Sequence, residues 1–391
     1  MSITGRDDGS PGPDRISYAM VGGGQGAFIG AVHRLAARLD DEFALVAGAL
    51  SSEPERAVAS ARALGIAPDR SYASWQELIE RESARPDKVE AIAIVTPNHV
   101  HYAPAKAALE AGFHVICDKP MTTTLEEARS LAETVKRTGR LFILTHNYTA
   151  YPMIRHARAM VAAGELGRLR VVQVEYAQGW LATPLEGTGH KQADWRTDPK
   201  RSGAGGSVGD IGTHAFNLAS FVSGLNATSL CADLSIFVEG RRLDDNANVL
   251  LRFEGGATGM LWASQVAIGN ENRLVLRLYG EKGGLSWSQE QPNDLHWSPL
   301  GEATRLITRG TAHANAAAAR LTRIPSGHPE GYLEGFANLY GEAARAIRAA
   351  RTGSPPDAEV LYPTVEDGVR GVAFIEATVA SSAKGGVWVP L

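Results

Sequence analysis

The sequence lacks the long apolar stretches, the charge imbalance and the cysteine content that mark several large classes of protein. No run of about 18 apolar residues is present, so we expect no membrane-spanning helix. Lys and Arg number 39 and Asp and Glu 43, a net charge of −4 that argues against a strongly basic nucleic-acid-binding protein. The two cysteines, Cys117 and Cys231, are too few for a disulfide framework or an all-cysteine zinc site. We therefore expect a cytoplasmic protein without a nucleic-acid or membrane partner.

The length of the chain predicts more than one domain. Its 391 residues correspond to two domains of roughly 100–200 residues each. Residues 1–15 are polar, rich in Gly, Pro and Asp, and without the apolar core of a signal peptide, so they are predicted to form a disordered arm. We expect a first domain over 16–148 and a second over 149–391.

The first predicted domain alternates short apolar segments with segments of helical pattern. The predicted strands are Ile16–Val21, Phe43–Leu50, Val89–Val95, His114–Cys117 and Leu141–Thr145. The predicted helices are Phe28–Leu39, Pro54–Leu64, Pro104–Ala111 and Leu125–Thr138. This order predicts an α/β fold, a doubly wound Rossmann sheet of parallel strands with helices on both faces.

The second predicted domain has strands in succession with few helices between them. The predicted strands are Leu169–Tyr176, Leu230–Val238, Ala247–Phe253, Gly259–Gln265, Leu274–Tyr279, Gly284–Trp287 and Val387–Val389. Helices are predicted over Gly331–Arg351 and Val365–Ala383. The pattern predicts an α/β domain with a large open, mostly antiparallel sheet.

A glycine-rich segment joins the first predicted strand to the first helix. Gly22, Gly24 and Ala27 fit the pattern Gly-x-Gly-x-x-Gly/Ala, in which glycines let the backbone approach a pyrophosphate at a helix N-terminus. The register stays open, because Gly30 can equally supply the third glycine. The segment predicts a dinucleotide site.

The end of the second predicted strand bears on the choice of dinucleotide. An Asp or Glu that holds the ribose hydroxyls of NAD is usual here, but this chain has Ser51 and Ser52. With Arg56 the serines suit the 2′-phosphate of NADP, and with Glu53 they suit NAD. They can also simply cap the next helix.

Two further strand ends carry polar residues that face the same expected crevice. Thr96-Pro97-Asn98-His99-Val100-His101 follows one strand and Asp118-Lys119-Pro120 the next. The two histidines allow a zinc pair, but with no third ligand evident we expect helix capping and cofactor contact instead.

The last motif is the glycine run Gly203–Gly209, which leads into a helix carrying Asp210 and His214. A separation of four residues puts both side chains on one face of an α-helix. Oxidation of an alcohol needs a base with a pKa near 7, which histidine provides, and a nearby carboxylate can orient it or bind a neighbouring hydroxyl. The alternative is a capping Asp and an ordinary buried His.

Taken together, the motifs Gly22–Ala27, Thr96–Asn98, Asp118–Pro120, Trp195-Arg196 and Gly205–His214 resemble the Gfo/Idh/MocA oxidoreductases, and the resemblance runs from about Ile16 to Leu391. It implies a Rossmann domain, and a second domain whose sheet forms the interface of a dimer or tetramer. It also implies that Lys119, Asp210 and His214 are the catalytic residues. Asp118 stands where the family has Glu, and the branch containing scyllo-inositol dehydrogenases looks similar.

From the motifs and the resemblance we expect two sets of binding residues. The cofactor, NAD or alternatively NADP, is expected to contact Gly22, Gly24, Gln25, Ala27, Phe28, Ser51, Ser52, Arg56, Thr96, Pro97, Asn98, His101, Asp118, Lys119, Asn147, Trp195 and Arg196. The substrate is expected to contact Lys119, Tyr148, Tyr151, Gln178, Arg196, Asp210, His214 and His328. No metal is expected.

The polar character of the expected substrate site suits a polyhydroxylated ring, such as an inositol or an aldohexose. We therefore expect a dehydrogenase of a cyclic polyol or sugar. An NADPH-driven ketosugar reductase, an NAD-dependent redox glycosidase and a non-catalytic dinucleotide sensor remain as alternatives, although a sensor needs none of the three catalytic residues.

Overall fold

The computed structural model describes residues 14–391, which form two compact units. The first unit contains the described chain up to Thr122, Glu126–Asn147 and Tyr332–Gly368. The second contains Thr123–Leu125, Tyr148–Gly331 and Val369–Leu391. The predicted disordered arm lies, except for Asp14 and Arg15, outside the described residues.

The first unit is built on a five-stranded parallel sheet in the order β2-β1-β3-β4-β5. Its strands are β1 (Ile16–Gly22), β2 (Phe43–Ala49), β3 (Ala91–Val95), β4 (His114–Cys117) and β5 (Phe142–Leu144). They are buried on both faces, which explains their uninterrupted apolar sequences. The strand order reverses between β1 and β3, and ligands of open α/β sheets bind at the carboxyl ends of the strands at such a point.

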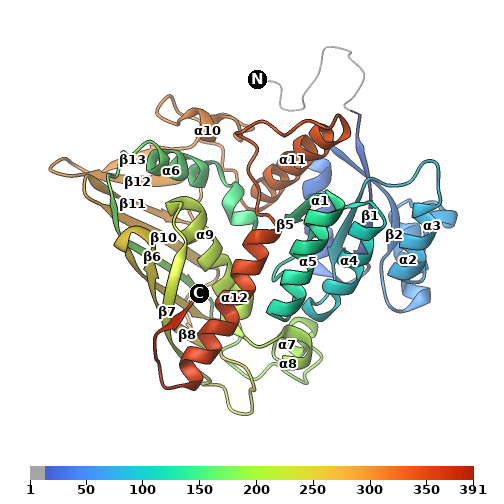
Figure 1. Ribbon diagram of the computed structural model, residues 1–391, viewed down its shortest axis with the longest axis horizontal. Coiled ribbons are helices and arrows are strands. Elements are labelled where there is room, and N and C mark those ends of the chain that lie inside the picture. Colours follow the sequence, from blue (N-terminus) through green and yellow to red (C-terminus); the bar gives the residue numbers. More distant parts are fainter. Residues whose placement is uncertain (1–13) are drawn as a thin grey trace. The chain divides into compact units, whose positions relative to one another are not determined.

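Helices cover both faces of this sheet (Figure 1). They are α1 (Phe28–Leu39), α2 (Pro54–Ala63), α3 (Trp75–Ser83), α4 (Tyr102–Glu110) and α5 (Leu125–Thr138). From β1 the chain moves to β2 at one edge of the sheet, and from β2 it moves back across the sheet to β3, β4 and β5. Right-handed crossovers therefore place α1 on one face and α3, α4 and α5 on the other. The expected Rossmann fold is confirmed.

The first unit also contains a segment from late in the chain. Helix α11 (Tyr332–Arg351) packs against α1, where Tyr340 donates to or accepts from His33 Nδ1 at 2.8 Å and Phe336 contacts the same imidazole. The structure therefore differs from the expected division into 16–148 and 149–391. The change of unit after Asn147 lies beside the expected boundary, but the return of Tyr332–Gly368 had no signal in the sequence.

The second unit is built on a nine-stranded sheet in the order β13-β12-β11-β10-β6-β9-β8-β7-β14. These strands are β6 (Leu169–Ala177), β7 (Ala227–Ser235), β8 (Asn246–Phe253), β9 (Thr258–Ser264), β10 (Arg273–Gly280), β11 (Gly283–Ser288), β12 (Asp294–Pro299), β13 (Arg305–Thr308) and β14 (Val389–Pro390). Neighbouring strands are antiparallel except β6 and β9, which run parallel with Ala177 opposite Ser264. The open, mostly antiparallel sheet is confirmed.

The helices of the second unit include several that the sequence pattern did not predict. They are α6 (Pro152–Ala162), α7 (Lys191–Arg196), α8 (Pro199–Ser202), α9 (Thr213–Ser223), α10 (Ala316–Ala319) and α12 (Val365–Ala383), the last of which begins in the first unit. Helices α6 and α9 pack against each other, and α9 packs against β6, β9 and β10. Helix α9 thereby carries its residues close to the centre of the sheet.

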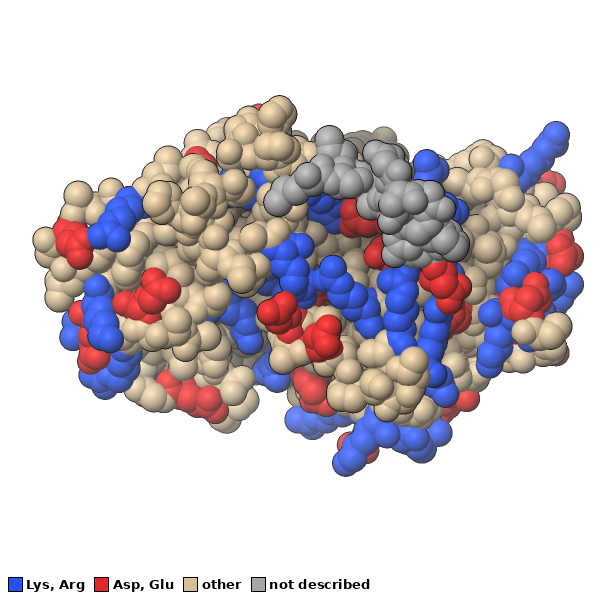
Figure 2. All heavy atoms as spheres, turned by 90° about the horizontal axis from the view of Figure 1, so that it is seen from above, with Lys and Arg blue, Asp and Glu red and all other residues tan. Residues whose placement is uncertain are grey.

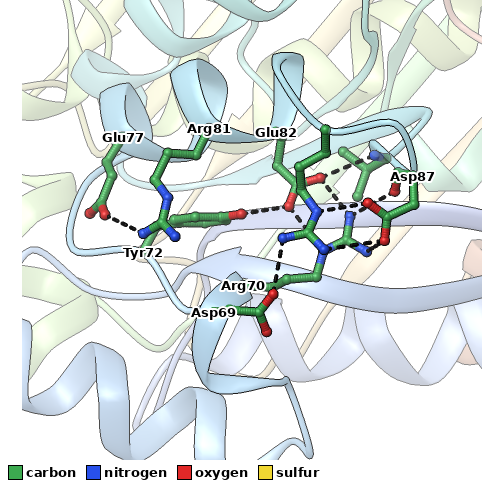
Figure 3. Close-up of polar contacts among 9 residues, drawn as sticks. Asp69, Arg70, Tyr72, Glu77, Arg81, Glu82 and Asp87 are labelled. Carbon is green, nitrogen blue, oxygen red and sulfur yellow. Dashed lines mark hydrogen bonds and ion pairs between the residues drawn. The ribbon is translucent and has the colours of Figure 1, made fainter.

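A buried carboxylate organises the connection between β2 and β3 (Figure 3). Glu82 on α3 is fully buried and binds Arg70 through two nitrogens, at 2.6 and 3.0 Å. Its oxygens also accept from Tyr72 Oη at 2.7 Å and from the backbone nitrogen of Val89 at 3.1 Å. These hydrogen bonds connect α3 to the segment that precedes it and to Val89, just before β3.

Basic and acidic side chains lie next to one another on the surface shown in Figure 2. Arg348 forms an ion pair with Glu42, and Arg351 forms one with Glu90. No helix of the described residues is long and apolar enough to cross a membrane.

Candidate active site

The glycine loop is shaped by contacts that exclude side chains. A Cβ on Gly24 would lie 2.6 Å from the carbonyl oxygen of Leu50, and a Cβ on Gly30 only 2.3 Å from the Cα of Gly23. Gly22 and Gly23 have φ of 81° and 73°, which favours glycine. Gly30, rather than Ala27, is thus the residue that lets α1 approach the loop, which answers the question of register.

The N-terminus of α1 is open to an anion. Ala27 is its N-cap residue, no described side chain caps it, and the first turn carries no acidic residue. Phe28 is exposed, and the backbone nitrogen of Gln25 donates to Ser60 Oγ at 3.0 Å. Unpaired N–H groups and a positive helix end bind a pyrophosphate favourably.

After the end of β2, Ser51 and Arg56 both contact Glu53. Ser51 Oγ accepts from the backbone nitrogen of Glu53 at 3.1 Å, and Glu53 is the N-cap residue of α2. The Glu53 carboxylate pairs with Arg56 at 3.0 Å, and Ser52 is exposed beside them. The charge of Arg56 is therefore already compensated.

Two buried polar atoms near the strand ends have no hydrogen-bond partner among the described residues. They are Oγ1 of Thr96, which follows β3, and Nδ2 of Asn147, which follows β5. A Cβ on Gly22 would lie 2.9 Å from Thr96 Cγ2, so Thr96 adjoins the glycine loop. Because leaving such atoms unpaired is costly, they indicate a polar ligand. Together with the glycine cradle and the uncapped helix end, they fit a dinucleotide.

His101 lies at the start of α4 and is fully buried. Its Nδ1 lies 2.8 Å from the carbonyl oxygen of Pro120 and its Nε2 lies 2.8 Å from that of Thr96. Both ring nitrogens thus face backbone, which differs from the expectation of direct cofactor contact. Pro97 and the buried Asn98 form the turn between Thr96 and this histidine.

Lys119 follows β4 and is held by the residue before it. Its backbone nitrogen donates to Asp118 Oδ1 at 2.9 Å, and the same oxygen accepts from Thr145 Oγ1 at 3.0 Å. Burial, and then the positive charge of Lys119, lower the pKa of the buried His146 to about 3. His146 is therefore neutral at pH 7, and Lys119 carries the positive charge of this strand end.

In the second unit Asp210 and His214 do not share one regular α-helix. Asp210 lies in a π-helical turn, Val208–Gly212, and His214 lies in the first turn of α9. This corrects the expected α-helical spacing; π-helical turns are frequent at functional sites. Both residues nevertheless meet Tyr148. The centre of the His214 ring lies 4.9 Å from that of Tyr148. Burial and then the Asp210 charge raise the pKa of Tyr148, and its hydrogen bonds with Tyr176 and Asn272 oppose them.

The N-terminus of this π-helical turn is held by Asp244, from a loop far along the chain. The Asp244 carboxylate accepts from the backbone nitrogens of Gly206 and Val208, at 2.6 and 2.8 Å, and from Ser207 Oγ at 2.7 Å. A Cβ on Gly206 would lie 2.1 Å from the Asp244 carbonyl oxygen. The glycine run is therefore needed for close packing.

Asp210 is itself fixed by two donors. Arg196 Nε donates to its Oδ2 at 3.0 Å and Gln265 Nε2 donates to the same oxygen at 2.9 Å. The Arg196 guanidinium lies 4.3 Å from the centre of the Trp195 ring. The Asp210 carboxylate is thus held in one orientation by two donors.

A second chain of hydrogen bonds runs beside His214. Tyr176 Oη donates to Asn272 Oδ1 at 2.8 Å, so Tyr148 Oη must donate to Tyr176 Oη, 2.6 Å away. Gln178 Nε2 donates to Asn272 Oδ1 at 2.7 Å, and Gln178 Oε1 accepts from Trp180 Nε1 at 2.9 Å. Tyr176 lies at the end of β6, and Gln178 and Trp180 lie in the connection that follows the strand.

Tyr151 and His328, which the sequence predicted to bind the substrate, make contacts of other kinds. Tyr151 is buried between Tyr148 and Trp287, with ring centres 6.0 and 5.6 Å away, and so supports Tyr148 from behind. His328 is exposed in a loop whose shape depends on Arg309, to which it offers its carbonyl oxygen. Within residues 14–391, the His328 side chain forms no hydrogen bond with the network around His214.

Sequence reasoning missed Tyr176, Asp244, Gln265 and Asn272. Only Tyr176 had a local signal, its place at the end of the predicted strand Leu169–Tyr176. Gln265 lies beside this strand end because β6 and β9 are parallel, and that pairing is not evident from the sequence. Asp244 and Asn272 lie in connections whose course the periodicity does not predict.

Comparison with known proteins gives the following matches. Residues 16–146 match a family model described as an oxidoreductase family with an NAD-binding Rossmann fold, and residues 154–286 match one described as a GFO/IDH/MocA C-terminal domain. An uncharacterized oxidoreductase of Bacillus subtilis is 34% identical over 96% of both chains.

Two solved structures are similar over almost the whole chain. An oxidoreductase from Sinorhizobium meliloti is 55% identical, with a TM-score of 0.88 over 96% of this chain and 99% of the other. An inositol dehydrogenase homologue from Azotobacter vinelandii, complexed with NADH and myo-inositol, is 38% identical, with a TM-score of 0.90 over 96% and 98%.

Proposed function

The chain belongs to the Gfo/Idh/MocA family of oxidoreductases, and we propose that it oxidises a ring hydroxyl of a cyclic polyol or sugar. The substrates proposed are an inositol, such as scyllo- or myo-inositol, which gives a ketone, and an aldohexose pyranose, which gives a lactone. The proposed acceptor is NAD.

The observation that carries the proposal is the oriented polar array around His214. Asp210, held by Arg196 and Gln265, and the chain from Tyr148 to Trp180 place several donors and acceptors beside one histidine. A ring with hydroxyls on successive carbons offers several donors and acceptors to these polar side chains, whereas an apolar alcohol offers a single hydroxyl. The inositol complex of the A. vinelandii homologue supports this class of substrate.

In the proposed mechanism NAD, when bound, supplies the hydride acceptor. Gly22, Gly24 and the N-terminus of α1 would hold its pyrophosphate, and Thr96 Oγ1 and Asn147 Nδ2 would bind its polar groups. His214 would take the proton of the reacting hydroxyl as the carbon–hydrogen bond breaks. Lys119 would stabilise the negative charge that develops on the same oxygen, and Asp210 would accept a hydrogen bond from a neighbouring hydroxyl.

The test is a reduction screen of purified protein with NAD or NADP against inositols and aldohexoses, followed by the absorbance of the reduced cofactor. Reduction of NAD with a cyclic polyol is expected. Binding of NAD without any reduction would contradict the proposal; turnover of a ketosugar with NADPH, or of a glycoside without net reduction, would then establish the reductase or the redox glycosidase. Assembly through the second unit's sheet and a cytoplasmic location stay predictions.

A further inference from the structure

His101 contacts both the loop that follows β3 and the loop that carries Lys119, yet the proposed reaction leaves it unused. It is fully buried, and its two nitrogens lie 2.8 Å from the carbonyl oxygens of Thr96 and Pro120. One contact belongs to the loop with the unpartnered Thr96 hydroxyl, and the other to the loop with Lys119.

The contact with Pro120 completes a clamp on the backbone of Lys119. On the N-terminal side, Asp118 Oδ1 accepts from the Lys119 nitrogen at 2.9 Å and is anchored to Thr145. On the C-terminal side, proline has no N–H, so its carbonyl is the one backbone group through which a hydrogen bond can hold it. The ring of His101 occupies that position.

Such a clamp matters because a lysine side chain is long and flexible. Its ammonium group can be placed only if the backbone that carries it is fixed, and a misplacement of about 1 Å can lower a rate by about 100-fold. His101 Nε2 faces the Thr96 carbonyl oxygen at the same distance, so the ring bridges both loops. Burial lowers the pKa of His101, so the neutral ring carries one N–H and donates to one of the two carbonyl oxygens at a time.

We propose that His101 is a positioning residue with two separable tasks: through the Pro120 carbonyl it places Lys119 for catalysis, and through the Thr96 carbonyl it shapes the NAD site. The first task rests on the proposed function, since it assumes that Lys119 acts on the substrate. The second concerns dinucleotide binding alone.

The two tasks can be separated by substitution, because the amide nitrogen of Asn matches the position of Nδ1 in His and that of Gln matches Nε2. H101Q places an amide donor toward the Thr96 carbonyl and none toward that of Pro120, whereas H101N does the opposite, so each variant keeps one of the two contacts that the wild-type ring can make. We expect H101Q to lower kcat by about 10- to 100-fold with little change in the Kd for NAD. We expect H101N to raise the Kd for NAD by about tenfold and to lose much less of kcat than H101Q at saturating NAD.

The measurements are calorimetric titration with NAD, steady-state kinetics with the polyol found in the screen, and the rate at which dilute acetic anhydride labels Lys119 in the free protein. The exposed Lys88 serves as the internal reference for labelling, and H99Q, at an exposed histidine of the same turn, as the matched control variant. A changed labelling rate of Lys119 in H101Q alone supports the proposal.

Equal losses in both variants, in step with a lower melting temperature and with unchanged labelling of Lys119, would overturn it, because His101 would then be structural only. If no polyol is oxidised, the proposed function fails by itself. The Kd for NAD and the labelling rate still decide whether His101 has its two tasks.

Discussion

His214 is the residue on which the proposed chemistry depends. It is buried against Tyr148 and lies on a helix that is packed into the sheet. A base held in this way needs little rearrangement to accept a proton.

We therefore predict that H214N lowers kcat by about 10²- to 10⁴-fold while the Kd for NAD stays unchanged. The exposed H296N, on β12, is the control for replacing a histidine in the same unit. Steady-state kinetics and calorimetric titration measure the two quantities. Full activity of H214N would exclude it as the base.

At the end of β2 the pairing of Arg56 with Glu53 predicts a preference for NAD over NADP. A 2′-phosphate would need Arg56 to leave its partner and would meet the Glu53 carboxylate as a like charge. We predict that E53Q improves kcat/KM for NADP by about tenfold, a gain of about 1.4 kcal/mol in transition-state stabilisation. E55Q removes an equal charge from the same helix, and an equal gain in that control would contradict the account.

At the scale of elements, α3 is anchored by Glu82. Burial alone would raise the pKa of Glu82, but the hydrogen bonds from Arg70, Tyr72 and Val89 prevail and lower it. A carboxyl whose pKa is lowered by folding stabilises the native state above its ordinary pKa near 4.3, and this contribution is lost as the pH falls through the folded-state pKa.

We predict that E82Q lowers the free energy of unfolding by about 3 kcal/mol at pH 7, because it leaves the buried end of Arg70 without a counter-charge. The difference from the wild type shrinks as the pH falls below about 4 and through the lowered folded-state pKa of Glu82, where its carboxyl takes up a proton. Urea unfolding at the two pH values gives the comparison, with the exposed E80Q on the same helix as control.

The π-helical turn that carries Asp210 depends on one close approach. We predict that G206A lowers the free energy of unfolding by about 1–3 kcal/mol, because its Cβ would overlap the Asp244 carbonyl oxygen. G209A, in the same turn, meets no atom within 4 Å and is expected to unfold at the same urea concentration as the wild type, or a higher one. Equal destabilisation by both substitutions would refute the packing argument.

Elements with a strong local pattern were predictable, and the connections that complete the site were not. The strand of His114–Cys117 and the helix of Phe28–Leu39 have the bounds that apolar periodicity indicated. Helix α3 was missed because its polar sequence, WQELIERES, has few apolar residues to mark its buried face. The π-helical turn was missed because glycine spacing alone does not distinguish it from an α-helix.

At the scale of the whole molecule, segments that are far apart in the sequence belong to the same compact unit. Apart from Trp195 and Arg196, every residue expected to bind the cofactor precedes Tyr148, yet α11 completes the first unit from the far end of the chain. Sequence reasoning assigned this helix to the second domain, since its amphipathic pattern does not indicate which partner its apolar face meets.

We predict that residues 1–148 alone do not form a stable NAD-binding domain, because His33, Phe43 and their neighbours lose the buried Phe336 and Tyr340. Fusion of residues 332–368 through a flexible linker should restore cooperative unfolding and NAD binding. Circular dichroism and calorimetric titration test both fragments, and tight NAD binding by 1–148 would contradict the division into units.

The central claim, that hydride leaves a ring carbon of the substrate for NAD, is tested most directly with a cyclic polyol deuterated on its ring carbons. After turnover the reduced cofactor is isolated and its mass measured, together with the rate relative to the unlabelled polyol. The account predicts one deuterium in the reduced cofactor and none in that formed from the unlabelled polyol. Substrate consumption without deuterium in the cofactor would contradict it.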